Sequence, residues 1–135
     1  METIKQYSQL NKNIQRGIAL GNFDGVHIGH QKLIKTLVQK CRLNNLQSCI
    51  YTFANHTLEI ITGREIPLQI TDMRMKQKIF KSLGVELLYL EEFNKDLMVL
   101  SPEDFIKDIL IEKLNCKIVT VGFDYSFGYK GQGNV

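Results

Sequence analysis

The stretch Gly21-Asn-Phe-Asp-Gly-Val-His-Ile-Gly-His30 stands out in this sequence of 135 residues. It follows a short apolar run, residues 17–21 (Gly-Ile-Ala-Leu-Gly), which is typical of a buried strand in a parallel sheet. From near Gly29 onward the apolar residues recur at helical spacing: Leu33, Ile34, Leu37, Val38 and Cys41. The stretch therefore predicts a glycine-bearing turn that joins a strand to a helix.

Further strands and helices alternate along the rest of the chain. Strand-like runs lie at residues 48–53, 85–90 and 117–122. One helix is expected to begin near Asp72, to end before Gly84 and to bury the apolar stripe Met75, Ile79, Phe80 and Leu83. Another opens at Ser101-Pro-Glu-Asp104, with a serine N-cap, proline in the first helical position and acids at the positive helix end. This order predicts an α/β fold, a Rossmann-like parallel sheet with helices on both faces.

Ligands of such sheets bind beyond the carboxyl ends of the strands, here the loops after Leu20, Phe53, Leu90 and Val121. In the first of these loops, glycines allow a ligand to approach the backbone closely. The helix N-terminus that follows favours phosphate, and His27 and His30 are placed to donate to phosphate oxygens. The loop therefore predicts a phosphate site that uses two histidines in place of a lysine.

Other interpretations of this loop remain open. It is neither a Walker A loop nor a GxGxxG fingerprint, because the lysine of the first and the spacing of the second are missing. The glycines and histidines are also compatible with a purely structural turn and cap. A zinc site is a further alternative, in which His27 and His30 combine with Asp24 or His56.

Composition limits the classes of protein that fit. The chain is 44% hydrophobic and 23% charged with a net charge of +3, which indicates a globular protein and no concentrated basic stripe for nucleic acid. Cys41, Cys49 and Cys116 form no CxxC pair and are expected to be reduced and mostly buried. No signal peptide or membrane-spanning run of ~20 apolar residues is apparent. We therefore expect a cytoplasmic protein with no membrane or nucleic-acid partner.

The run Gly21 to Gln31 resembles the opening signature of bacterial FAD synthetases, and His27-Ile-Gly-His30 is similar to the HxGH element of the wider nucleotidylyltransferase superfamily. Three more segments fall in the order and spacing of that family: Thr52-Phe53, residues 100–105 (Leu-Ser-Pro-Glu-Asp-Phe) and residues 121–128 (Val-Gly-Phe-Asp-Tyr-Ser-Phe-Gly). The resemblance extends over essentially the whole chain.

The resemblance implies a nucleotidylyltransferase fold and transfer of AMP from ATP to FMN, with Mg²⁺, giving FAD and pyrophosphate. His27 and His30 would be the catalytic residues that stabilise the phosphates. Asp124 would help to hold Mg²⁺, and Phe53, Asn55 and His56 would border the flavin. The implied ATP-binding residues are Gly21, Asn22, Phe23, Asp24, Gly25, His27, Gly29, His30, Gly122, Phe123, Asp124 and Phe127.

The sequence also departs from the family pattern. Asn55-His-Thr57 stands where the family usually has Pro-His-Pro, and Ser126 replaces a basic residue. A Ser-Ser-Thr…Arg element and a riboflavin kinase domain that follow in the family are not seen within residues 1–135. We expect one adenylyltransferase domain that is incomplete at its C-terminus. Two alternatives stay open: another acceptor, such as phosphopantetheine, nicotinate or glycerol phosphate, and a non-catalytic nucleotide- or flavin-binding module.

Overall fold

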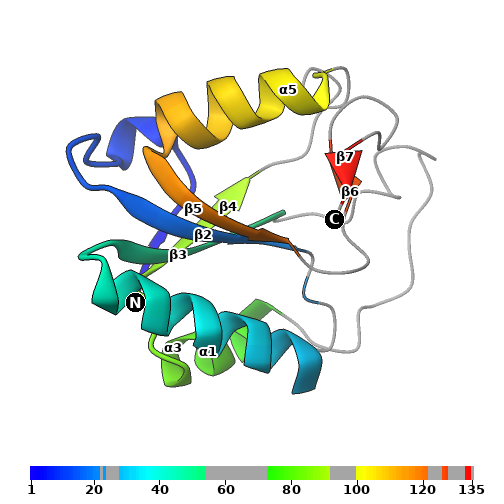
Figure 1. The fold of residues 1–135 in the computed structure, drawn as a ribbon. Coiled ribbons are helices and arrows are strands. Elements are labelled where there is room, and N and C mark those ends of the chain that lie inside the picture. Colours follow the sequence, from blue (N-terminus) through cyan, green and yellow to red (C-terminus); the bar gives the residue numbers. More distant parts are fainter. Residues whose placement is uncertain are drawn as a thin grey trace.

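The computed structural model describes residues 1–21, 23, 28–53, 73–91, 100–121, 126–127 and 133–134. Strands and helices alternate along the chain (Figure 1). The elements are β1 (Glu2–Ile4), η1 (Tyr7–Gln9), β2 (Arg16–Leu20), α1 (Ile28–Leu43), β3 (Gln47–Phe53), α3 (Met73–Ser82), β4 (Leu87–Glu91), α5 (Pro102–Asp104), η2 (Phe105–Lys113), β5 (Cys116–Val121), β6 (Ser126–Phe127) and β7 (Gly133–Asn134).

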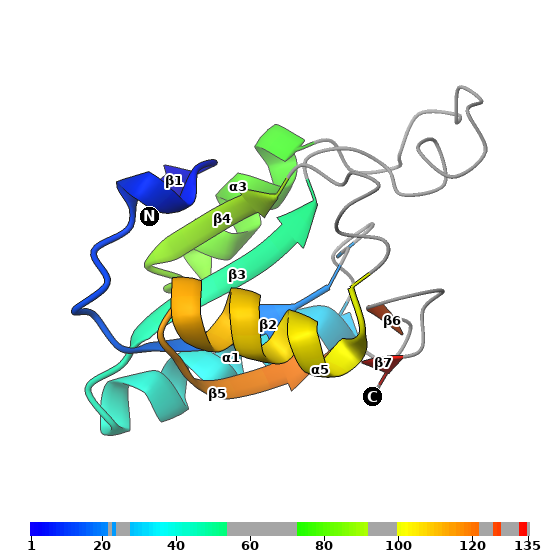
Figure 2. The same ribbon diagram turned by 90° about the horizontal axis from the view of Figure 1, so that it is seen from above.

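Five strands form one parallel sheet in the order β1-β4-β3-β2-β5, which can be followed in Figure 2. Leu20 of β2 pairs with Tyr51 of β3 and with Val121 of β5, and Phe53 pairs with Glu91 of β4. Because all five strands run the same way, their carboxyl ends meet at one edge of the sheet. The predicted parallel sheet is confirmed, and β6 and β7 form a separate antiparallel pair.

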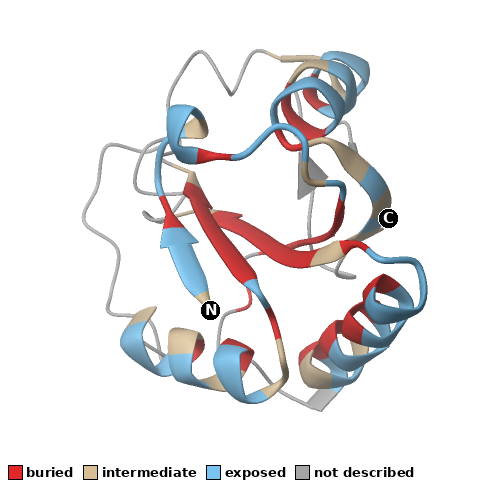
Figure 3. Ribbon diagram, turned by 90° about the vertical axis from the view of Figure 1, so that its left-hand side faces the viewer, coloured by how far each residue is buried: buried red, intermediate tan, exposed pale blue. Residues whose placement is uncertain are grey.

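Helices cover both faces of the sheet, as predicted (Figure 1). On one face, α1 and α3 pack over a core cluster that includes Ile34, Ile50 and Phe80. On the other face, η1 and the continuous helix α5–η2 pack over a second cluster that includes Ile18 and Phe105. Figure 3 shows buried residues in the central strands and on the inner sides of the helices. The sheet thus separates the core into two layers.

Two local signals act as the sequence predicts. The Ser101 side chain accepts a hydrogen bond of 3.1 Å from the backbone N–H of Asp104, which caps α5. Gly84 adopts a φ of +91° after α3, a conformation that glycine takes without steric cost. Helix α5 continues directly into η2, where the Leu114 N–H donates to the Ile109 carbonyl at 3.2 Å, one residue further back than in an α-helix.

Other expectations need correction. Strand β1 lies in the polar N-terminal segment, where no strand was predicted. Met75 was expected in the buried stripe of α3 but is 56% exposed, whereas Lys76 is 6% exposed. Lys76 lies one turn before Phe80, so its aliphatic stem shares the buried face of the helix. The cysteine prediction holds, since Cys41 and Cys49 are buried, Cys116 is half-buried and all three are free thiols.

Arg16 ties together the amino edge of the sheet and is only 2% exposed. Its guanidinium donates to Gln47 Oε1 at 2.8 Å and to the backbone carbonyls of Leu114 and Asn11 at 3.0 Å each. Burial lowers the pKa of this guanidinium from its ordinary value. These bonds join β2 to its neighbours at the end of the sheet opposite to the expected ligand site.

Candidate functional site

The candidate site lies at the carboxyl edge of the sheet. Of its residues predicted from sequence, the structure describes Gly21, Phe23, Gly29, His30 and Phe53, and it places the backbone of Phe127 in β6. The remaining predicted residues lie outside the described part of the chain: Asn22, Asp24, Gly25, His27, Asn55, His56, Gly122, Phe123 and Asp124.

Gly21 and Phe23 form the described part of the loop after β2. The Gly21 N–H donates to the Tyr51 carbonyl at 3.4 Å, which extends the ladder between β2 and β3 by one residue. A Cβ on Gly21 would lie 2.8 Å from Cζ of Phe23, so glycine is needed to make room for that ring. Phe23 has a φ of +56° and is 2% exposed. Its ring belongs to the core beneath the site, a structural role that the ATP-binding prediction did not include.

His30 stands in the first turn of α1 and is 9% exposed. Its imidazole makes an edge contact with the Phe23 ring, at 5.4 Å between centroids and 75° between planes. Phe23 makes a similar contact with Phe80 of α3 at 5.6 Å. The histidine is therefore held by the aromatic core, and this fixes the direction of its ring at the start of the helix.

Gly29, next to His30, is exposed, and a Cβ built there would meet no atom within 4 Å. It occupies an ordinary helical position without the positive φ that would require glycine. Neither packing nor backbone conformation explains glycine at this position. The open space is compatible with the close approach of a ligand predicted from the sequence.

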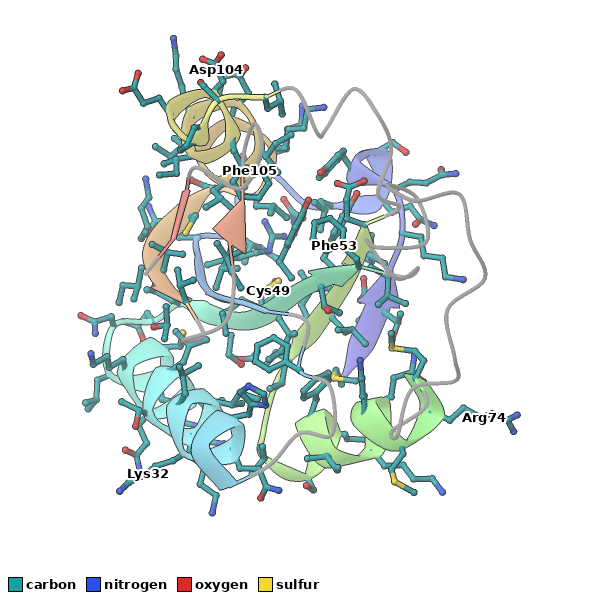
Figure 4. All side chains as sticks on the ribbon, turned by 90° about the vertical axis from the view of Figure 1, so that its right-hand side faces the viewer. Lys32, Cys49, Phe53, Arg74, Asp104 and Phe105 are labelled. Atoms are coloured by element: carbon teal, nitrogen blue, oxygen red, sulfur yellow. The ribbon has the colours of Figure 1, made fainter. Side chains whose placement is uncertain are left out.

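The layer formed by α1 and α3 is strongly basic. Neither helix contains an acidic residue, and Lys32, Lys35, Arg74 and Lys78 are all exposed. In Figure 4, Lys32 and Arg74 extend outward from α1 and α3, while Asp104 lies on α5 at the opposite side. The basic side chains of α1 and α3 are thus not offset by acidic residues of the same helices, and such unbalanced positive charge favours anionic ligands.

The ends of β3 and β4 form the other side of the site. Phe53 is half-buried, pairs in register with Glu91 and makes an edge contact of 6.0 Å with Tyr51. Phe53 packs against the core layer of α5–η2, whereas Phe23 and its neighbour His30 lie on the α1 and α3 side. The candidate phosphate and flavin residues therefore approach the carboxyl edge from opposite faces of the sheet.

No metal cluster is found among the described residues, where three or more His, Cys, Asp or Glu side chains never come together in a suitable arrangement. Asp24, His27 and His56 of the zinc alternative lie outside the described part, as does the magnesium candidate Asp124. Within the same described ranges, no helix is both long and apolar enough to cross a bilayer.

Comparisons with known proteins identify relatives along the whole chain. The family model for FAD synthetase matches residues 10–135. A bifunctional riboflavin kinase/FMN adenylyltransferase from Buchnera aphidicola is 37% identical over 136 aligned residues, covering 100% of this chain and 44% of the relative. Proteins of the same name are 36% identical in Listeria monocytogenes, over 91% of this chain and 39% of the relative, and 31% identical in Escherichia coli, over 99% and 44%. The chain thus spans less than half the length of these relatives.

A solved structure agrees with the fold. The crystal structure of a protein from Streptococcus pneumoniae, described as a macrolide-efflux protein, superposes with a TM-score of 0.82 at 29% identity. It covers 97% of this chain, and the match takes in 43% of that protein. Three findings agree with one another: the parallel sheet, the HxGH element in the sequence and the match over residues 10–135. The chain therefore belongs to the FAD synthetase family.

Proposed function

We propose that this chain carries FMN adenylyltransferase activity, in which the phosphate of FMN attacks the α-phosphate of ATP, FAD forms and pyrophosphate leaves. The observation that carries the proposal is the pair Gly29 and His30 in the first turn of α1, at the carboxyl edge of a parallel sheet. Membership of the FAD synthetase family supports FMN and ATP as the two substrates.

The described residues support a phosphate site on the α1 side. The helix N-terminus carries the positive end of the helix dipole, and the exposed Gly29 leaves space for a phosphate to approach it. His30, held against Phe23, donates to a phosphate oxygen as charge builds up in the transition state. His27 lies one turn earlier in the sequence and has the same role in the proposal.

The other expected residues complete the site. Phe53, with Asn55 and His56 after it in sequence, borders the flavin on the opposite side of the edge. The side chain of Asp124 would hold Mg²⁺, whose preference for oxygen ligands fits a carboxylate and whose charge would offset that of the phosphates. The nucleotide would be lined by Gly21, Asn22, Phe23, Asp24, Gly25, Gly122, Phe123 and Phe127. A cytoplasmic location is part of the proposal, and the free thiols of Cys41, Cys49 and Cys116 support it.

The proposal is tested by incubating the full-length protein with Mg-ATP and FMN and measuring FAD and pyrophosphate. His30→Ala is expected to lower kcat/KM by roughly one to several orders of magnitude, because it removes a transition-state donor. His30→Gln, which retains a donor and more of the side-chain volume, is expected to lose less. Far-UV circular dichroism checks that both variants fold.

Two results would oppose the proposal. Pyrophosphate release with another phosphate acceptor, and none with FMN, would assign a different substrate to the same fold. Tight binding of ATP or FMN without turnover would instead favour the non-catalytic binding module.

A further inference from the structure

A buried aromatic cluster lies behind Phe53, on the α5 face of the sheet. Tyr51 of β3 is 0% exposed and stacks on Tyr89 of β4 at 5.6 Å, with the two rings 4° from parallel. Tyr89 in turn stacks on Tyr7 of η1 at 4.8 Å. Phe105 closes the cluster through an edge contact of 5.8 Å with Tyr51. Three tyrosines from three separate elements therefore form one rigid stack.

A single carboxylate joins the hydroxyl ends of this stack. Oε2 of Glu91, the last residue of β4, accepts hydrogen bonds from the hydroxyl of Tyr51, at 3.0 Å, and from that of Tyr7. Such hydrogen bonds to an ionised acceptor are stronger than neutral ones. Lys113 of η2 places its Nζ 4.5 Å from the centre of the Tyr7 ring, which further holds this ring in place. We call Tyr7, Tyr51 and Glu91 the tyrosine–carboxylate clamp.

The clamp is connected to the candidate flavin side of the site by direct contacts. Glu91 pairs in register with Phe53, and Tyr51 precedes Phe53 by two residues on the same face of β3. The edge contact between Tyr51 and Phe53 joins the two rings. The clamp therefore ties the end of β3 to the end of β4 and to the N-terminal segment. It also lies across the sheet from the face that carries His30 and Phe23.

We infer that the clamp positions Phe53 for binding of the flavin ring, so that Glu91, Tyr51 and Tyr7 determine affinity for FMN without acting on ATP. This inference rests on the proposed function. Its physical basis is preorganisation: an aromatic surface that is already fixed loses less side-chain entropy when a flat ring stacks on it. Glu91 and the two tyrosines are thus positioning residues that act through Phe53.

Isosteric variants of the full-length protein test the inference. Tyr51→Phe removes one hydroxyl and keeps the ring stack. We expect it to raise the Kd of FMN by up to about tenfold, because one lost charge-assisted hydrogen bond sets the upper bound. Glu91→Gln retains an acceptor oxygen without the charge, so an increase of about threefold is expected. Tyr7→Phe should behave like Tyr51→Phe. Quenching of FMN fluorescence measures the Kd without any need for turnover.

The matched control is Glu86→Gln, which removes an exposed carboxylate just before β4, at the opposite edge of the sheet. It should leave the Kd of FMN unchanged. In steady-state assays, the clamp variants should raise the KM for FMN while the KM for ATP stays within about twofold of the wild type. This selectivity separates a positioning role from general destabilisation.

Two outcomes would overturn the inference in a wild-type protein that makes FAD: an unchanged Kd for FMN in Tyr51→Phe and Tyr7→Phe, or equal increases in the KM values for FMN and ATP. A lower melting temperature with unchanged FMN binding would likewise reduce the clamp to a structural role. Failure of the wild type to form FAD from ATP and FMN is a distinct result, which would refute the proposed function itself.

Discussion

Replacement of Gly29 by alanine tests whether the fold or a bound ligand requires glycine at this position. Gly29 is exposed in the first turn of α1, has no positive φ and would place a Cβ in open space, with no atom within 4 Å. Alanine restricts the unfolded chain and favours the helix, so the free energy of unfolding should rise by up to about 1 kcal/mol. At about 3–5 °C per kcal/mol for a domain of this size, the melting temperature should rise by no more than about 5 °C.

The same substitution should be harmful to catalysis. The added methyl group occupies the space through which a phosphate would reach the backbone N–H groups at the start of α1. Displacement of a reacting phosphate by ~1 Å costs on the order of a hundredfold in rate. We therefore expect kcat/KM for FAD formation in Gly29→Ala to fall by about 10- to 100-fold while the protein becomes no less stable.

The assay combines steady-state FAD formation with urea denaturation of the same preparation. Retention of kcat/KM within about twofold of the wild type would refute the argument, because the space above Gly29 would then not be used by a phosphate. A fall of more than 1 kcal/mol in the free energy of unfolding would refute the claim that an alanine side chain fits at this position of α1. Gly21→Ala is the matched contrast: its Cβ meets Phe23 at 2.8 Å, so here stability and activity should fall together.

The remaining predictions concern the core and the titration of a buried thiol. Gly17→Ala places a Cβ 2.4 Å from Cys41 Sγ and should lower the unfolding free energy in urea by about 1–3 kcal/mol; an unchanged midpoint would show that the packing can adjust. Thr52 is 1% exposed, and its Oγ1 has no hydrogen-bond partner among the described residues. Thr52→Val should therefore raise the unfolding free energy by about 1 kcal/mol. A loss of stability would instead reveal a partner for the hydroxyl. Burial raises the pKa of the Cys49 thiol from 9.0 to about 12, so the unfolded chain loses this proton first and stability should fall as the pH rises from 9 towards 12. Chemical denaturation across that range should show a shallower decline for Cys49→Ala, and an identical decline would contradict the assignment.

The sequence predicts the structure correctly where the decisive interactions are local. The cap of α5 joins Ser101 to Asp104, which are three positions apart, and Gly84 acts just after the end of α3. The alternation of apolar runs and helical patterns is also a local property of the chain, and it was sufficient to predict a parallel sheet with helices on both faces.

Local sequence patterns do not reveal an element that depends on distant partners. Strand β1 has only three residues, two of them exposed, and it exists because it pairs with β4 more than 80 residues away. In the stripe predicted for α3, Phe80 is buried and Ile79 and Leu83 pack against the core, but Met75 is exposed. The apolar stem of Lys76 takes the expected place of Met75 on the buried face.

The sequence by itself determined that β2 precedes α1 and that His30 lies in the first turn of this helix, since both follow from the local pattern of apolar residues. Only the tertiary structure decided which side chains meet near the carboxyl ends of the strands. Phe23 turns into the core and supports His30, and Tyr7 reaches Glu91 across 84 positions of sequence. The physical reason is that strand order and register bring such residues together, and neither is encoded in the local pattern.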